Sequence, residues 1–347
     1  MKNLIRIIVI SLMIVSCQKT PELPNSNYTI GGGVFVVNEG NFRSGNGSLS
    51  FYSYDSSKIY NDLFYSVNGR PLGDVPNSMA INGDKAYIIV NNSGKIEVMD
   101  QSTLKSTATI TGLISPRNIS FINDNKAYVS SLYSDSVTII NLINNSISGY
   151  INIRRSSESI ASTGNQAFIS NWTGGKEIMV INTIDDQVVD SIEVGIEPES
   201  MVFDRYGMLW VLCNGGWARL NYAELVEINT STNYVEKTLV FPTKEASPTC
   251  LKIDGLGTTL YYLDNGVRQI DISSTEIPSI TFIIQESGEY FYKIGINPLN
   301  NDVFITDAVD FVKQGYLLLY DGTGKFISKL EAGIIPGSMC FKLRINT

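Results

Sequence analysis

Short apolar runs that alternate with polar residues cover most of the chain, and Asn, Asp and Gly separate them. Residues 75–113 show a proline, an alternating run, an Asn-Gly-Asp turn, Lys-Ala-Tyr at 85–87, an apolar run, a polar tip and two further β-rich runs. Period-two alternation with such breaks is typical of antiparallel strands. The pattern therefore predicts four strands in a repeat of about 40 residues.

This four-strand unit recurs along the chain. Residues 115–153 repeat the pattern of 75–113, and later units begin near Ser156, Pro198, Pro248, Tyr290 and Pro336. The last unit, which begins at Pro336, supplies one strand before the sequence ends. Three more strands are expected near the N-terminus, in the segments 31–40, 47–55 and 58–66. We expect the C-terminal strand to complete the blade that the N-terminal segments begin.

The repeat predicts an all-β fold, a seven-bladed β-propeller of four-stranded antiparallel blades whose ring is closed by the C-terminal strand. Radial repetition of small sheets leaves few exposed strand edges. The alternatives are a pair of β-sandwiches and a β-helix, but the period is too regular for the first and too long for the second. Residues 31–347 are expected to form this single domain.

The N-terminus has the pattern of a secretory signal. Lys2 and Arg6 precede an apolar run at 7–15 that is too short to span a bilayer. Residues 14–17 resemble a bacterial lipobox, which predicts a signal peptide at 1–16 and a lipid on Cys17; an ordinary signal peptide with a chance cysteine is the alternative. The polar, proline-bearing segment that completes 17–30 is expected to be a tether.

Charge and cysteine content exclude some functions. Removal of residues 1–16 takes away Lys2 and Arg6 and lowers the formal charge from −8 to −10, so nucleic-acid binding is not expected. The chain has no histidine, and the remaining cysteines, at 213, 250 and 340, form no C-x-x-C motif. We expect buried thiols, with one disulfide pair left open, and neither a metal site nor an intrinsic cofactor.

One face of the propeller is expected to carry the function. If the strands of each blade are named A to D from the channel outward, the B–C loops and the D–A connections emerge on this face, and short A–B and C–D turns emerge on the other. Five of its B–C loops carry an aromatic residue, and three of them, 38–47, 214–224 and 307–315, are long. The predicted ligand-binding residues are Asn38, Glu39, Asn41, Phe42, Asn91, Arg117, Tyr133, Arg155, Asn171, Trp172, Asn214, Trp217, Tyr290, Asp307 and Phe311.

Each of these residues also has a structural explanation. A loop aromatic can pack on a neighbouring loop, and an Asn at a strand end can cap a turn with its own side chain. Arg154 and Arg155 can pair with Glu158 and Glu197 in a surface network of small energetic value. A carboxylate pair, Glu158 and Glu199, offers acid–base chemistry in principle. Without histidine, and with mostly neutral, small residues in the strands that line the channel, we expect no enzymatic activity.

The stretch 85–110 and its copies resemble the YVTN-type propeller repeat. Together with the lipobox, the short tether and the opening GGVFVVNEGNF, the chain resembles the surface lipoproteins of gut Bacteroidetes that capture cobalamin (vitamin B12). The resemblance implies a lipid-anchored outer-membrane lipoprotein at the cell surface, monomeric apart from its transporter, that binds a corrinoid and passes it to a TonB-dependent transporter. The sequence of the tether leaves a periplasmic orientation of the anchor open. A surface glycan-binding or protein-docking lipoprotein is the alternative.

Overall fold

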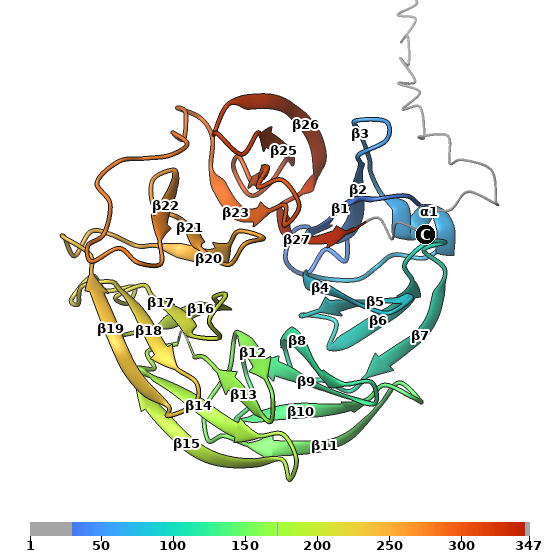
Figure 1. Ribbon diagram of the computed structural model, residues 1–347. Coiled ribbons are helices and arrows are strands. Elements are labelled where there is room, and N and C mark those ends of the chain that lie inside the picture. The colour runs from blue at the N-terminus through green and yellow to red at the C-terminus, as the bar shows by residue number, and fades with distance from the viewer. Residues whose placement is uncertain (1–29, 172, 344–347) are drawn as a thin grey trace, which may run out of the picture.

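Seven small β-sheets stand around a central axis in the computed structural model of the protein (Figure 1). The structure describes residues 30–171 and 173–343. The predicted signal peptide, the lipidation of Cys17, almost all of the tether, and Trp172 therefore lie outside the described residues.

Blades are numbered here from the one that contains both ends of the domain. Blade 1 consists of β27 (Pro336–Lys342), β1 (Gly33–Asn38), β2 (Ser48–Ser53) and β3 (Lys58–Tyr60), in that order from the axis. Blade 2 consists of β4 (Pro76–Asn82), β5 (Lys85–Val90), β6 (Lys95–Asp100) and β7 (Ser106–Thr111). Blade 3 consists of β8 (Pro116–Asn123), β9 (Lys126–Ser131), β10 (Ser136–Asn141) and β11 (Ser146–Asn152).

The remaining blades follow in chain order. Blade 4 consists of β12 (Ile160–Thr163), β13 (Gln166–Ile169), β14 (Glu177–Asn182) and β15 (Gln187–Glu193). Blade 5 consists of β16 (Pro198–Phe203), β17 (Leu209–Cys213), β18 (Glu224–Asn229) and β19 (Tyr234–Val240). Blade 6 consists of β20 (Thr249–Ile253), β21 (Thr259–Leu263) and β22 (Val267–Asp271), and blade 7 of β23 (Phe291–Ile296), β24 (Val303–Asp307), β25 (Gln314–Tyr320) and β26 (Phe326–Ile334).

The predicted seven-bladed propeller and its closure are confirmed. Within every blade, strands that follow one another in the sequence pair antiparallel. The C-terminal strand β27 pairs with β1, with Phe35 opposite Cys340, so both ends of the domain share one sheet. The described cysteines, Cys213, Cys250 and Cys340, are free, and the disulfide that the sequence left open is not formed.

Two segments differ from the predicted four-strand pattern. The expected strand at 58–66 ends at Tyr60, and the helix α1 (Leu63–Asn68) follows it, because Leu63 and Phe64 bury their side chains against β2. In blade 6 the outer strand is missing. An irregular connection that contains Pro278 takes its place. In this connection, Ile283 forms a single β-bridge with Val267. Proline supplies no backbone N–H for a continuous ladder.

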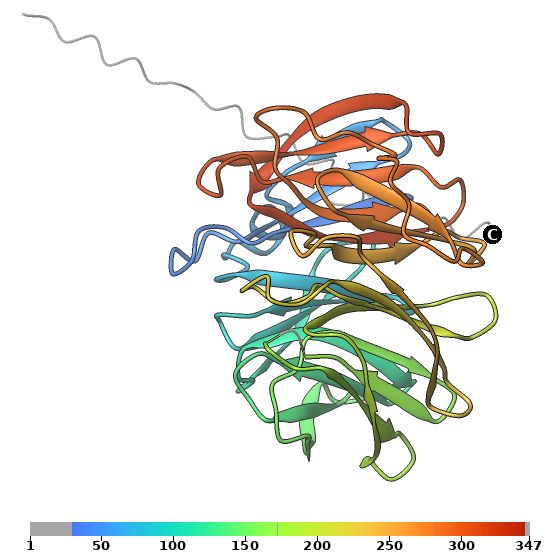
Figure 2. The ribbon, with the colours of Figure 1, turned by 90° about the vertical axis from the view of Figure 1, so that its left-hand side faces the viewer.

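Apolar side chains fill the spaces between neighbouring blades. Between blades 5 and 6, for example, Trp210 and Leu212 pack with Leu260 and Tyr262, and all four are fully buried. Burial of such side chains from both sheets holds each blade to the next. Strands run across the thickness of the ring, so the loops emerge on its two faces (Figure 2). Among the described residues, no helix has the length and apolar character needed to cross a membrane.

Candidate functional site

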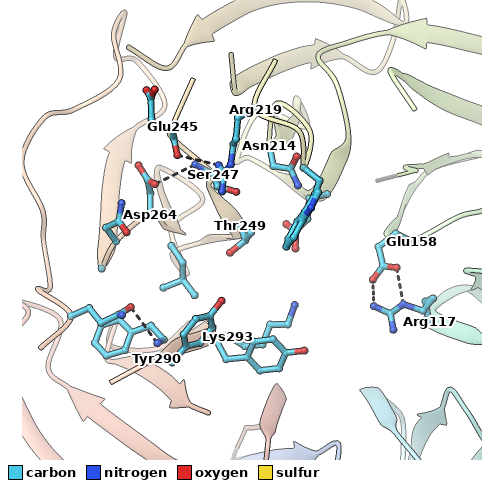
Figure 3. A pocket seen from close by; sticks show the side chains of 18 residues that line it. Arg117, Glu158, Asn214, Arg219, Glu245, Ser247, Thr249, Asp264, Tyr290 and Lys293 are labelled. Atoms are coloured by element: carbon cyan, nitrogen blue, oxygen red, sulfur yellow. Dashed lines mark hydrogen bonds and ion pairs between the residues drawn. The ribbon is translucent and has the colours of Figure 1, made fainter. Parts of the chain in front are cut away.

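A cavity of about 570 Å³ lies at one end of the central channel (Figure 3). Its floor comes from the first residues of the inner strands, or the residues just before them, in five consecutive blades, 3 to 7. Its wall comes from the B–C loops of blades 5 and 6. The residues that line it are Arg117, Glu158, Glu199, Asn214, Trp217, Arg219, Glu245, Ser247, Thr249, Leu263, Asp264, Asn265, Gly266, Gln285, Tyr290, Phe291, Tyr292 and Lys293.

An ion pair joins two blades on one side of this floor. Nε and Nη2 of Arg117 donate to the two carboxylate oxygens of Glu158 at 2.7 and 2.9 Å, and both side chains are largely buried. Burial works to lower the pKa of Arg117, but the Glu158 carboxylate outweighs it, so that the pKa lies above its ordinary value. The predicted pairing of an arginine with Glu158 thus occurs, but through Arg117.

A second polar contact joins blades 7 and 1 beside the cavity. The Tyr292 hydroxyl donates to Oε1 of Glu39 at 2.8 Å. Gly337 leaves room for this carboxylate, because a Cβ there would lie 3.0 Å from Oε1. Burial raises the pKa of Glu39 above its ordinary value, although the Tyr292 hydrogen bond opposes the change. Glu39 is therefore a partly buried carboxyl group that the Tyr292 hydroxyl holds in place.

The wall loop 214–224 presents an aromatic side chain beside the cavity. Oδ1 of Asn214 accepts the N–H of Gly216 at 2.8 Å, and both Gly215 and Gly216 have positive φ, which makes the chain turn sharply. Nη1 of Arg219 donates to the carbonyl oxygens of Glu245 and Ala246 at 3.1 and 2.9 Å. These bonds hold the loop down while the Trp217 side chain stays 91% exposed.

A second aromatic group stands across the cavity. The Phe311 ring packs edge-on against Tyr290 and Tyr292, with ring centres 4.9 and 5.4 Å apart. Nδ2 of Asn41 donates to the carbonyl oxygen of Phe311 at 3.3 Å, which joins the long loops of blades 1 and 7. Here the packing explanation of a loop aromatic describes Phe311, whereas Tyr290 also lines the cavity.

Four predicted site residues form internal hydrogen bonds instead. Asn38 is fully buried and bonds Ser48, Ser50 and the N–H of Gly333. Asp307 is fully buried and accepts from Tyr290 N and Lys329 Nζ. The remaining two hold loops in place. Asn91 donates to Oγ of Ser115 and to the carbonyl oxygen of Pro116. Asn171 caps its own turn, because its Oδ1 accepts from the hydroxyl of Ser156 and from the backbone N–H and hydroxyl of Thr173.

Three other predicted residues do not line the cavity. Phe42 and Tyr133 are 64% and 79% exposed, and the Arg43 guanidinium lies over the Phe42 ring. Arg155 forms an ion pair with Glu177, a different partner from the Glu158 and Glu197 that the sequence suggested. The cavity thus brings together Arg117, Asn214, Trp217 and Tyr290 from the predicted set, with Glu39 joined to its floor through Tyr292.

The sequence analysis missed the lysine on the floor. Lys293 lies two residues after Phe291, at the position where other blades have Ser78, Asn118, Ser200 and Cys250. An alignment of the repeats could have identified Lys293, since only blade 7 among these has a charged side chain at a position where the others have a small or neutral one. Arg219, Asp264 and Gln285 were also missed, and they come from irregular loops that no repeat position marks. Among the described residues, no group of three or more His, Cys, Asp or Glu is placed to hold a metal ion.

The architecture and the cavity define a class: a seven-bladed β-propeller with a polar cavity, edged by aromatic side chains, at one end of its channel. A family described as a domain of unknown function (DUF5074) matches residues 32–332, and the chain belongs to this family. No curated protein matches the chain.

Several solved structures are similar to this one. A quinonprotein alcohol dehydrogenase-like protein from Bacteroides thetaiotaomicron is 16% identical, with a TM-score of 0.71 over 91% of this chain and 79% of that one. Hydrazine synthase from Kuenenia stuttgartiensis is 14% identical, with a TM-score of 0.61 over 76% and 89%. Apo AztD from Citrobacter koseri is 12% identical, with a TM-score of 0.57 over 90% and 98%. At these identities the likeness shows the fold.

Proposed function

We propose that the protein is a binding protein that captures cobalamin or a related corrinoid on the loop face of the propeller and delivers it to a TonB-dependent transporter. The observation that carries the proposal is the position of Trp217, an indole 91% exposed at the edge of a polar cavity of about 570 Å³. An exposed indole beside a concave polar surface is the arrangement expected for a ligand with a broad apolar face.

The chemistry of a corrin ring suits this surface. The ring is wide, rigid and apolar in its body, and amide side chains surround its edge. Trp217 and Tyr290 offer flat contact area, while Asn214, Asn265 and Gln285 offer both donors and acceptors to amides. Because the chain has no histidine, a bound cobalamin would keep its own benzimidazole or a water at the lower face of cobalt.

The carboxylates in the floor of the cavity support binding in preference to catalysis. Glu158 is held by Arg117, and Oε2 of Glu199 accepts the N–H of Cys250 at 2.8 Å. A general acid–base pair needs carboxylates that can exchange protons with a substrate. Both members of the only pair that the sequence suggested are instead engaged in contacts between blades.

The position of Ile30 supports the proposed anchoring at the outer membrane through Cys17. The Ile30 N–H donates to the Ser102 carbonyl oxygen in the C–D turn of blade 2, which lies on the face opposite the cavity. A tether that enters there would leave the cavity facing away from the lipid surface, where a monomer could take up ligand from outside the cell and meet a transporter.

A direct test uses the colour of the ligand. A soluble chain that lacks residues 1–17 is mixed with cyanocobalamin, and free ligand is removed on a desalting column. The proposal predicts a red protein fraction with one corrinoid per chain. A colourless fraction, together with no heat of binding by calorimetry, would reject the corrinoid and leave the alternative of a glycan-binding or protein-docking lipoprotein.

A further inference from the structure

The floor of the cavity contains an ammonium group without a protein acceptor. Lys293 lines the cavity with Thr249 (Figure 3), and its Nζ lies 5.2 Å from the centre of the Tyr292 ring. Within residues 30–171 and 173–343, Nζ of Lys293 makes no hydrogen bond or ion pair. Lys293 is partly buried. An ammonium carries three donors, and even its partial withdrawal from water is costly when they stay unused.

The carboxylates near Lys293 accept hydrogen bonds from other groups. Glu158 is bound by Arg117, Glu39 accepts from Tyr292, and Glu199 accepts from the backbone of Cys250. Their charges still act on Lys293 from a distance. Burial works to lower its pKa, but Tyr292, Glu199 and Glu39 outweigh burial and raise the pKa above its ordinary value. Lys293 therefore remains a cation at neutral pH.

The equivalent residues in other blades have a structural task that Lys293 does not share. Oγ of Ser78 donates to the Arg117 carbonyl oxygen at 2.6 Å, and Nδ2 of Asn118 donates to that of Glu158 at 3.0 Å. Oγ of Ser200 accepts the N–H of Leu251 at 2.8 Å. Each of these side chains ties its inner strand to the next one. The side chain of Lys293 faces the cavity instead.

We propose that Lys293 receives an anionic oxygen group of the ligand, a phosphate or a carboxylate, while Trp217 and Tyr290 contact the ligand's apolar body. This inference rests on the proposed function, since it needs a ligand in the cavity, and it narrows the ligand to an amphipathic molecule with an acidic group. Charge-assisted hydrogen bonds of this type are among the strong ones, and they strengthen where water is excluded.

Two corrinoids, one with and one without the nucleotide loop and its phosphate, test the inference. Cyanocobalamin carries a phosphodiester in this loop, and dicyanocobinamide lacks the phosphodiester together with the ribose and the benzimidazole. The Lys293→Met variant is expected to bind cyanocobalamin about 10- to 100-fold more weakly than the wild type and to bind dicyanocobinamide within about 3-fold of it. Lys58→Met, which removes an exposed lysine of the outer strand β3, is the matched control and should change neither affinity.

The outcomes separate the inference from the proposed function. If Lys293→Met weakens both corrinoids equally or neither, the anion assignment is wrong while corrinoid binding stands. If the wild type binds neither corrinoid, the proposed function fails, and the inference is then tested with pyrophosphate. Millimolar pyrophosphate should raise the thermal midpoint of the wild type and of Lys58→Met but not that of Lys293→Met. Equal shifts in all three would overturn the assignment.

Discussion

The last inner strand and the first described residue are joined by one side chain: Nζ of Lys342 donates to the carbonyl oxygen of Ile30 at 2.7 Å. The same ammonium donates to the Gln101 carbonyl oxygen at 3.0 Å and to Oγ of Ser102 at 3.1 Å. Lys342 thus connects the C-terminal strand, the entry to β1 and the C–D turn of blade 2 at the point where the ring closes.

Loss of this lysine should weaken the closed ring. Lys342→Met leaves three acceptors without their donor, so we expect the free energy of unfolding to fall by about 2–4 kcal/mol. Lys325→Met, which changes an exposed residue in the C–D turn of blade 7, should change it by less than about 0.5 kcal/mol. Urea unfolding followed by tryptophan fluorescence measures both. Equal stabilities of the two variants would show that the closure does not depend on Lys342.

Trp217 is predicted to act in binding and not in folding. Because its side chain is 91% exposed, Trp217→Ala should change the free energy of unfolding by less than about 0.5 kcal/mol, while it weakens cyanocobalamin binding about 10- to 100-fold. Tyr206→Ala, at an exposed residue in an A–B turn on the opposite face, is the control and should leave affinity unchanged. A large loss of stability in Trp217→Ala would identify the indole as a packing residue.

A buried carboxylate in blade 2 should make the free energy of unfolding depend on pH in the acid range. Glu97 is fully buried and accepts from Arg70, Lys95, Ser106 and Thr109. Burial works to raise the pKa of Glu97, but the hydrogen bonds from Arg70, Ser106 and Lys95 outweigh it, and the pKa is lowered. Its contribution to stability is therefore complete above the unfolded pKa of about 4.3 and is lost as pH falls through the lower native value.

Glu97→Gln removes the charge from this cluster and should lower the free energy of unfolding at pH 7 by about 3–5 kcal/mol. The difference between wild type and variant should narrow as pH falls below about 4.3, since the wild-type carboxylate then takes up a proton. Urea titrations at several pH values measure this difference. A gap that stays constant down to acid pH would contradict the assigned role of the ionised carboxylate.

The three described cysteines should be unreactive in the folded protein. Cys213 and Cys250 are buried, and burial raises the pKa of Cys213 and raises that of Cys340 to about 12, so thiolate is scarce at neutral pH. In a chain without residues 1–17, Ellman's reagent should react with no thiol before denaturation and with three after it. Rapid reaction of one thiol in the native protein would contradict this account.

The repeat made the fold predictable because successive blades place the same residue types at the same strand positions. The exceptions have local causes. Leu63 and Phe64 lie in a segment too short to show a helical period, and the irregular fourth element of blade 6 follows from the chain around Pro278. Neither change disturbs the ring, because both lie away from the inner strands.

The site was less predictable than the fold. Arg117, Asn214, Trp217 and Tyr290 line the cavity as members of the predicted set. Asn38 and Asp307 do not, because a polar residue at a strand end serves equally well to satisfy backbone groups, and the sequence contains nothing that separates the two uses. Lys293 was overlooked because one charge within a strand carries little weight until the inner positions of all blades are compared.

Hydrogen–deuterium exchange with and without cyanocobalamin tests the central claim most directly, since it reports both binding and its location. The account predicts protection of amides in 214–224, 264–266 and 285–293, the segments around the cavity, and no change in the turns at 101–105 and 204–207 on the opposite face. Protection confined to the opposite face, or no protection at a saturating corrinoid concentration, would contradict it.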